Sequence, residues 1–248
     1  MNEKKSPDAI NPLLETPDLE TRDNAAGLKG KSLKDLDSWE KMVQKRDIRD
    51  VFKGSALNLE CDKTTGFDTI RFQLEWERPK PQGFFNTLKD KLGKGQDIDL
   101  DLGCIYEMKD GTAGVIQPLG DLYGAFNKPP FIELSGDDRT GADEAGENLK
   151  VNGTMWPNIK RIVVYAYIYD GSTTWSQTKA KLHIWMKGQD PVNVNLEQYE
   201  DGLPVCVIAK LENVDNNIQI KNVNEYYPGH AEMDRAFGFG INWEEGRK

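Results

Sequence analysis

The sequence contains few of the residues that cross-link small domains or bind transition metals. Its 248 residues include three cysteines and two histidines, and the cysteines form no CxxC pair. This spacing argues against a disulfide framework and a thiolate metal site, so we expect reduced and mostly buried thiols. Neither histidine lies in a GxSxG or HExxH context, which disfavours a serine-hydrolase or zinc-protease site.

Long apolar runs are also lacking. The mean hydropathy is −0.66, and no run reaches the roughly 18 apolar residues that a membrane-spanning helix needs. The first residues, MNEKKSPDAINPLLETPD, contain lysines but not the apolar stretch of a secretory signal. We therefore expect a cytoplasmic protein.

Basic residues are in the minority, with 32 lysines and arginines against 41 acidic residues and a net charge of −9. Such a chain is poorly suited to following a nucleic-acid backbone, so no nucleic-acid partner is expected. Residues 97–101 have three acids and no base, and residues 133–147 have six acids and one arginine. These two segments account for nearly all of the net charge. Acidity this local indicates a bound cation.

Three regions differ in pattern. Residues 1–31 hold no aromatic residue and no sustained period, which predicts a flexible tail. Apolar residues recur at helical spacing in residues 32–46, so residues 32–53 are expected to form an N-terminal helix and a linker. In residues 54–248 the period is two, which predicts a β domain.

Many short strands are expected in this domain. Ile70, Phe72 and Leu74 alternate with Arg71 and Gln73, as in a strand with one buried face. The expected strands are residues 56–59, 70–76, 100–106, 160–169, 180–186, 205–211, 218–223 and 236–243. This pattern predicts a mainly β protein: an antiparallel β-sandwich with a short N-terminal helix and one small helical insertion.

The insertion comprises Pro79–Gly95. It carries four lysines against one aspartate, and Phe84, Phe85, Leu88 and Leu92 can share one helical face. Such a helix could cover the open end of the sandwich, or it could make weak peripheral contact with an anionic membrane or an acidic partner. Both interpretations stay open.

Alternating aspartates mark the strand expected after the insertion. Asp97, Asp99 and Asp101 project to one side while Leu100 and Leu102 face the core, so the carboxylates stand about 7 Å apart. Their mutual repulsion would be relieved by an oxygen-seeking cation such as Ca²⁺. The alternative is a solvated strand face whose charges protect a sheet edge.

The second acidic segment, residues 136–147, combines closely spaced carboxylates with glycine and other small residues. Tight backbone curvature there can turn carbonyl and carboxylate oxygens inward, which suits the six to eight ligands of Ca²⁺ better than the strict octahedron of Mg²⁺. The alternative is a plain polar loop. An EF-hand is excluded, because counting from Asp97 places Leu102 at position six and Met108 at position twelve.

Two specific motifs occur in order: DLDLGC at Asp99–Cys104 and GDDRTG at Gly136–Gly141. Further segments of the same kind are Gly54–Leu59, Phe72–Glu77, Ile162–Asp170 and Phe237–Gly240. Together they resemble the TerD-domain proteins of bacterial tellurite-resistance clusters over about residues 54–244. The N-terminal region and the lysine-rich insertion are more similar to the TerA-like branch than to the compact TerD proteins.

The resemblance implies a Ca²⁺-binding β-sandwich that is cytoplasmic or associated with the inner face of the membrane, and that serves tellurite resistance and stress response. The DxD motif of the family falls on Asp99 and Asp101. The family loop usually continues as TGEGDGDDE, whereas this one reads TGADEAGE, with Ala142 where the family has glutamate. The ligands predicted on this basis are Asp99, Asp101, Asp137, Asp138, Thr140, Asp143, Glu144 and Glu147.

The predicted function is therefore a non-catalytic, calcium-binding scaffold or interaction component of a tellurite-resistance and stress-response system. Its expected partners are other proteins of the tellurite-resistance type. One alternative is a metal-dependent enzyme subunit acting on a phosphorylated small molecule, although the acidic cluster offers only carboxylates and no evident base or nucleophile. Another is a metal-free acidic module that binds a basic partner.

Overall fold

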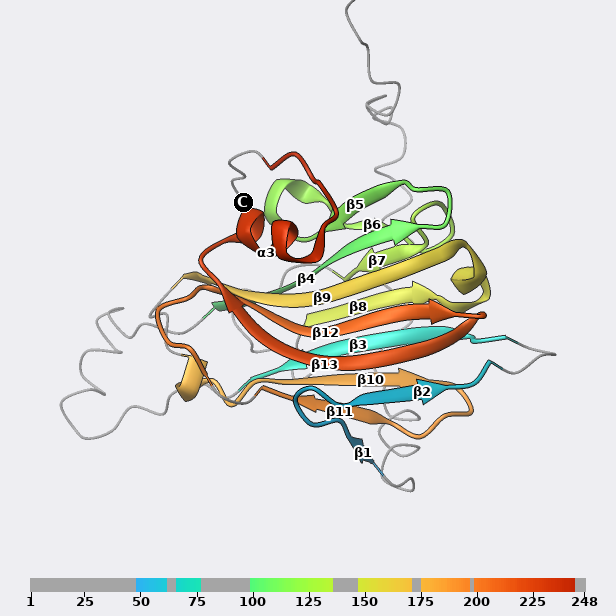
Figure 1. Cartoon of the computed structure of the whole chain (residues 1–248), viewed down its shortest axis with the longest axis horizontal. Helices are drawn as coiled ribbons and strands as arrows, with labels where there is room; N and C mark the ends of the chain where they lie inside the picture. Colours follow the sequence, from blue (N-terminus) through green and yellow to red (C-terminus); the bar gives the residue numbers. More distant parts are fainter. Residues whose placement is uncertain are drawn as a thin grey trace, which may run out of the picture. The chain divides into compact units, whose positions relative to one another are not determined.

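The computed structural model describes residues 48–61, 66–76, 99–135, 147–170, 175–196 and 199–243. These residues form two β-sheets, drawn in Figure 1. In order across the seven-stranded sheet, the strands are β1 (Arg49–Asp50), β11 (Val192–Asn195), β10 (Lys181–Met186), β3 (Thr69–Glu75), β8 (Glu147–Asn152), β7 (Ile132–Leu134) and β6 (Gly124–Ala125). In order across the six-stranded sheet, they are β2 (Ala56–Leu59), β13 (Asn217–Tyr227), β12 (Val205–Val214), β9 (Ile159–Asp170), β4 (Asp99–Met108) and β5 (Ala113–Ile116).

Neighbouring strands pair antiparallel, except that β1 runs parallel to β11. Short 3-10 turns occur at Leu119–Asp121, Gly153–Asn158 and Trp175–Gln177, and helix α3 spans His230–Phe237. The prediction of a mainly β, antiparallel sandwich is confirmed. Strand β1 lies within the segment that was expected to be a linker, and Val51 next to it belongs to the core.

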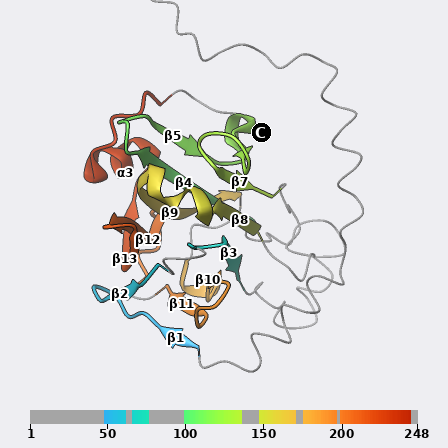
Figure 2. The same ribbon diagram turned by 90° about the vertical axis from the view of Figure 1, so that its right-hand side faces the viewer.

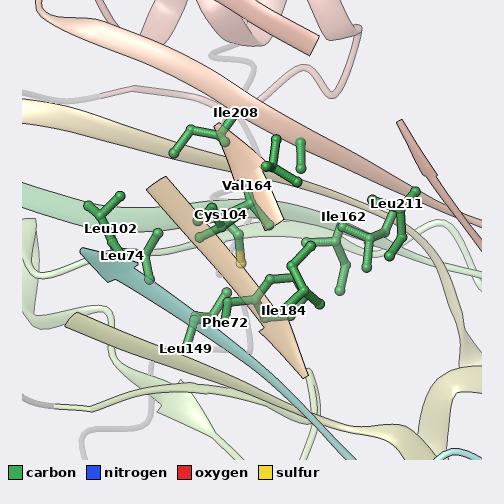
Figure 3. Close-up of a cluster of buried hydrophobic side chains, with 14 of the residues drawn as sticks. Phe72, Leu74, Leu102, Cys104, Leu149, Ile162, Val164, Ile184, Ile208 and Leu211 are labelled. Atoms are coloured by element: carbon green, nitrogen blue, oxygen red, sulfur yellow. The ribbon is translucent and has the colours of Figure 1, made fainter. Parts of the chain in front are cut away.

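The main core lies between the two sheets. On β3 the side chains of Ile70, Phe72 and Leu74 are fully buried while those between them are half-buried, as the period of two predicts. Figure 3 shows Phe72 and Leu74 close to Leu102 and Cys104 of the other sheet. Each sheet thus buries one face of its strands against the other sheet.

A second apolar cluster lies on the outer face of the six-stranded sheet, under α3. It consists of Ile105, Val163, Tyr165, Tyr167, Val205, Val207, Val223 and Met233. Figure 2 shows α3 beside this sheet, on the side away from the seven-stranded one. Strand β9 is therefore covered on both faces, which explains why its sequence, IVVYAYI, is an unbroken apolar run.

The strand predicted at residues 236–243 is wrong. The first two of these residues end α3, Gly238 caps the helix at a positive φ of 65°, and the following residues form no strand. The reason is Asp234, whose carboxylate accepts hydrogen bonds from the backbone N–H groups of Phe239, Gly240 and Ile241. Donors engaged in this way cannot pair with a neighbouring strand.

Several predicted features lie outside the described residues. These are the tail at 1–31, the helix at 32–46, the insertion at 79–95 and most of the acidic loop at 136–147. They stay predictions. In the part of the chain that the structure describes, no helix combines the length and the apolar character needed to cross a bilayer.

Candidate functional site

Three of the eight predicted ligands lie in the described part of the chain, and they come from both sheets. Asp99 and Asp101 belong to β4 of the six-stranded sheet, and Glu147 is the first residue of β8 in the seven-stranded sheet. The backbone N–H of Leu102 donates a hydrogen bond to Oε2 of Glu147. Glu147 therefore lies directly against the strand that carries the two aspartates. The predicted ligands outside the described residues are Asp137, Asp138, Thr140, Asp143 and Glu144.

Glu147 lies beside the part of strand β4 that strand β5 does not cover. Strand β5 pairs with β4 only from Cys104 to Glu107, so the first half of β4 has no neighbour from β5. The N–H of Leu102 would be left without a backbone partner there, and the Glu147 carboxylate accepts its hydrogen bond instead. Only 1% of Glu147 is exposed. The carboxylate thus closes the edge and joins the two sheets.

Asp101 lies on the outer face of its sheet, but not in solvent. Leu100 and Leu102 point into the core as predicted, and Asp101 points the other way. The second apolar cluster covers that face, so the exposure of Asp101 is 0%. The alternative of a solvated strand face is therefore wrong for Asp101, whereas Asp99 is half-buried. Sequence alternation assigned the face, and the apolar cluster on that face accounts for the burial.

Tyr167 is the direct cross-strand partner of Asp101. Burial raises the pKa of the Tyr167 phenol above its ordinary value, and the negative charge of Asp101 raises this pKa further, with a smaller contribution from Glu147. The pKa of Tyr165 is also well above its ordinary value, chiefly through burial, with a further contribution from the charge of Asp101. Both phenols keep their protons at neutral pH, in surroundings of negative potential.

The described residues alone do not make a complete metal shell. Among them, no group of three or more histidine, cysteine, aspartate or glutamate side chains is close enough to hold an ion. Any calcium shell built on Asp99, Asp101 and Glu147 would need further oxygens from residues 136–146, which lie outside the described residues.

The glycine of the DLDLGC motif makes room for a tyrosine. Gly103 pairs with Tyr165 on β9, and a Cβ added to Gly103 would lie only 2.6 Å from Cζ of that ring. The Tyr165 hydroxyl donates a hydrogen bond of 2.6 Å to Oε1 of Gln117. Tyr165 and Gln117 were not predicted as part of the site. The one signal for Tyr165 is its place in the apolar run of β9.

His230, the first residue of α3, packs among aromatic rings. Its ring centroid is 5.3 Å from that of Tyr165, 4.9 Å from that of Tyr167 and 5.1 Å from that of Trp243. Burial lowers the pKa of His230 to about 4. The imidazole is therefore neutral at physiological pH and acts as a packing element between the sheet and the C-terminal segment.

This histidine makes stability depend on pH. The unfolded chain binds a proton at His230 below about pH 6.5, whereas the folded protein does so only near pH 4. Stability should therefore fall by up to about 3 kcal/mol as the pH falls through this window. Urea unfolding of the wild type and of His230→Phe, at steps between pH 7 and 4, measures this contribution as the difference between the two curves. Parallel curves would contradict it.

The expected burial is confirmed for two of the three cysteines. Cys104 and Cys206 are fully buried, Cys61 is half-buried, and none of the three forms a disulfide with another described residue. Burial raises the pKa of both Cys104 and Cys206 above the ordinary thiol value. These two thiols therefore stay protonated and unreactive, which disfavours thiolate chemistry at either position.

Comparison with known proteins agrees with the sequence motifs. The tellurium resistance protein TerA of Alcaligenes sp. is 37% identical to the chain over 186 residues, which is 75% of this chain and 54% of that protein. The chain thus spans about half the length of the curated relative that it matches. No protein-family model matches the chain.

Proposed function

Since this chain belongs to the TerD-domain family of tellurium-resistance proteins, in its TerA-like branch, we propose that it binds Ca²⁺ and acts without catalysis as a scaffold or interaction component of tellurite resistance and stress response. The observation that carries the proposal is the position of Glu147 against Leu102, the residue that follows Asp101 on β4. The buried carboxylates of Asp101 and Glu147 come from different sheets and lie at one sheet edge.

The side-chain chemistry at this edge is of the kind that a calcium ion binds, although the described residues supply only part of a shell. Carboxylates are hard oxygen ligands, and burying two of the same charge is costly without compensation. Asp99, Asp101 and Glu147 would hold the ion together with oxygens from residues 136–146, where the predicted ligands are Asp137, Asp138, Thr140, Asp143 and Glu144. Bound Ca²⁺ would supply the positive charge that offsets this repulsion.

The ion would also act as a structural link. Strand β4 and strand β8 belong to different sheets, and the Leu102–Glu147 hydrogen bond is a direct polar connection between them. A cation held by both strands would add a second connection at the same edge. A scaffold whose edge is fixed in this way can present a defined surface to other proteins of the tellurite-resistance type. We propose that it acts in the cytoplasm, with residues 79–95 as the candidate segment for a weak peripheral contact with the inner face of the membrane or, alternatively, as a cover for the open end of the sandwich.

The first test is calorimetric titration of chelator-treated protein. The wild type should bind Ca²⁺ in preference to Mg²⁺, and the double variant Asp99→Asn/Asp101→Asn should lose the tightest site, because amides cannot replace two anionic ligands. The matched control is Asp50→Asn/Asp190→Asn, which changes the net charge equally at two exposed aspartates and should bind like the wild type. A wild type that binds no Ca²⁺ favours the metal-free acidic module.

Chelation provides an independent measurement. A ligand that binds only the folded state stabilises it by about 2.7 kcal/mol at a hundredfold excess over Kd. For a chain of this size, that free energy corresponds to a rise in melting temperature of roughly 5–10 °C. Melting curves recorded in Ca²⁺ and in chelator at neutral pH should differ by this amount for the wild type, and not for Asp99→Asn/Asp101→Asn.

A further inference from the structure

Four hydrogen-bond donors gather on the outer face of the seven-stranded sheet, on the side of the sandwich away from α3 (Figure 2). On β3 and β8, core residues alternate with residues that point away from the core. Arg71 and Gln73 therefore project outward from β3, and Asn148 and Lys150 project outward from β8. All four residues are half-buried. We call them the donor quartet.

The register of the two strands places the donor quartet in a compact rectangle. Arg71 lies directly opposite Lys150, and Gln73 lies directly opposite Asn148. Opposed residues of an antiparallel pair have Cβ atoms about 5 Å apart, and the next position on the same face is about 7 Å along the strand. A guanidinium, an ammonium and two amide groups therefore surround one small area of the sheet, and each of them can donate hydrogen bonds.

The pairing of Arg71 with Lys150 is unfavourable by itself. Like charges directly opposite each other on neighbouring strands destabilise a sheet, and partial burial weakens the screening of such charges by solvent. The next positions on this face of both strands are uncharged, namely Thr69, Gln73, Asn148 and Asn152. Strands β3 and β8 thus supply no negative charge next to the pair. An anion bound between the two cations would offset their repulsion.

The carboxylate that faces Lys150 in the register does not neutralise it. Glu133 on β7 lies directly opposite Lys150, yet within the described part of the chain Lys150 forms no ion pair with it or with any other acidic residue. Lys210 and Lys221, on β12 and β13, are also directly opposed. In that pair, Lys210 forms an ion pair of 2.8 Å with Glu212 of the same strand. The ammonium of Lys150 is thus available to an external anion.

The donor quartet suits a small oxyanion. The planar fork of an arginine matches two oxygens of one oxyanion, and a lysine contributes a second positive charge. The amides of Gln73 and Asn148 add donors that recognise oxygen without adding charge. Two positive charges match a divalent anion such as hydrogen phosphate, sulfate or tellurite. Since the chain has a net charge of −9, anions are repelled overall, and binding requires a local arrangement of this kind.

We propose that the donor quartet binds a small divalent oxyanion between Arg71 and Lys150. The site is separate from the proposed calcium site, because it uses no carboxylate and none of the predicted calcium ligands. Hydrogen phosphate and tellurite offer the same chemistry, a doubly charged anion with several acceptor oxygens. The similarity to a tellurium resistance protein makes tellurite one of the two sources to compare.

The test is calorimetric titration of the full chain with sodium phosphate, sulfate and tellurite, in chelator and at an ionic strength held constant with chloride. The wild type should bind at least one of these anions. Arg71→Gln/Lys150→Gln removes both charges but keeps polar side chains, and it should bind at least about tenfold more weakly, because charge-assisted hydrogen bonds are lost. The control Lys210→Gln/Lys221→Gln changes the net charge equally at the other opposed pair, and its affinity should stay within about twofold of wild type.

Two further measurements report on the same site. At constant ionic strength, the anion that binds should raise the melting temperature of the wild type and not that of Arg71→Gln/Lys150→Gln. In ¹⁵N spectra of the wild type, the Nε–H signal of Arg71, assigned with Arg71→Lys, should shift on addition of the anion. This shift tests the site even if the double variant does not fold.

The outcomes separate this inference from the calcium proposal. If none of the anions binds the wild type, or if the Arg71 signal stays in place, the oxyanion site is overturned, and calcium binding is untouched because chelator is present throughout. Equal weakening by the control variant also overturns the site, because net charge would then explain the effect. Binding of tellurite alone supports the site and identifies the tellurium oxyanion as its ligand, whereas binding of all the anions supports a general phosphate-type site.

Discussion

Replacing Gly103 with alanine is expected to lower the melting temperature by about 6–12 °C. The new Cβ would lie 2.6 Å from the Tyr165 ring, which is fully buried and tied to Gln117. The ring cannot withdraw without losing that hydrogen bond and its contact with His230. The resulting overpacking should cost about 2–4 kcal/mol, measured by thermal and urea unfolding in the presence of chelator.

Gly114 on β5 is the matched control for this change. A Cβ there would also meet a tyrosine ring, that of Tyr106. Tyr106 is only half-buried, however, so its ring can turn toward solvent and the loss should be less than half as large. Equal losses at Gly103 and Gly114 would show that confinement of the Tyr165 ring is not the cause. The double variant Gly103→Ala/Tyr165→Leu should be more stable than the sum of its single changes predicts.

Replacing Asp234 with alanine is expected to destabilise the protein by about 3–5 kcal/mol and to release the C-terminal segment. The carboxylate accepts from the N–H groups of Phe239 at 3.2 Å, Gly240 at 3.0 Å and Ile241 at 2.8 Å, and from the indole of Trp243 at 3.2 Å. Removing it breaks all four hydrogen bonds at once. Urea unfolding measures the loss, and amide hydrogen exchange of the three N–H groups reports the release.

The conservative variant Asp234→Asn tests the same account. Its amide keeps one acceptor oxygen but replaces the other with a donor, so the loss should lie between those of wild type and Asp234→Ala. Arg161 holds the segment independently, since it donates to the carbonyl groups of Phe237 and Gly238 and lies over the Phe239 ring. Unchanged amide exchange in Asp234→Ala would mean that Arg161 alone is sufficient.

Short-range sequence patterns predicted some features of the candidate site and missed others. The motif at Asp99–Cys104 predicted a strand with its leucines in the core and its aspartates on the other face, and the structure confirms this. Glu147 was proposed as a ligand from the acidic loop, and the structure places it against Leu102, 45 residues away in the chain. Tyr165, Tyr167 and His230 were not predicted as neighbours of the aspartates, because no short-range pattern connects β9 or α3 to β4.

The sequence by itself determined the strand periodicity, the apolar face of the strands, the burial of most of the thiols and the resemblance to the TerD-domain family, because each depends on side-chain type and on spacing along the chain. Only the tertiary structure decided that Asp101 is buried, that Glu147 closes an edge between two sheets, and that residues 236–243 end a helix rather than form a strand. These features arise from pairing and covering by distant segments: β5 stops short of the beginning of β4, α3 covers the outer face, and Asp234 takes the backbone donors that follow it. Alternation along a strand reports which face a residue occupies, and not what lies over that face.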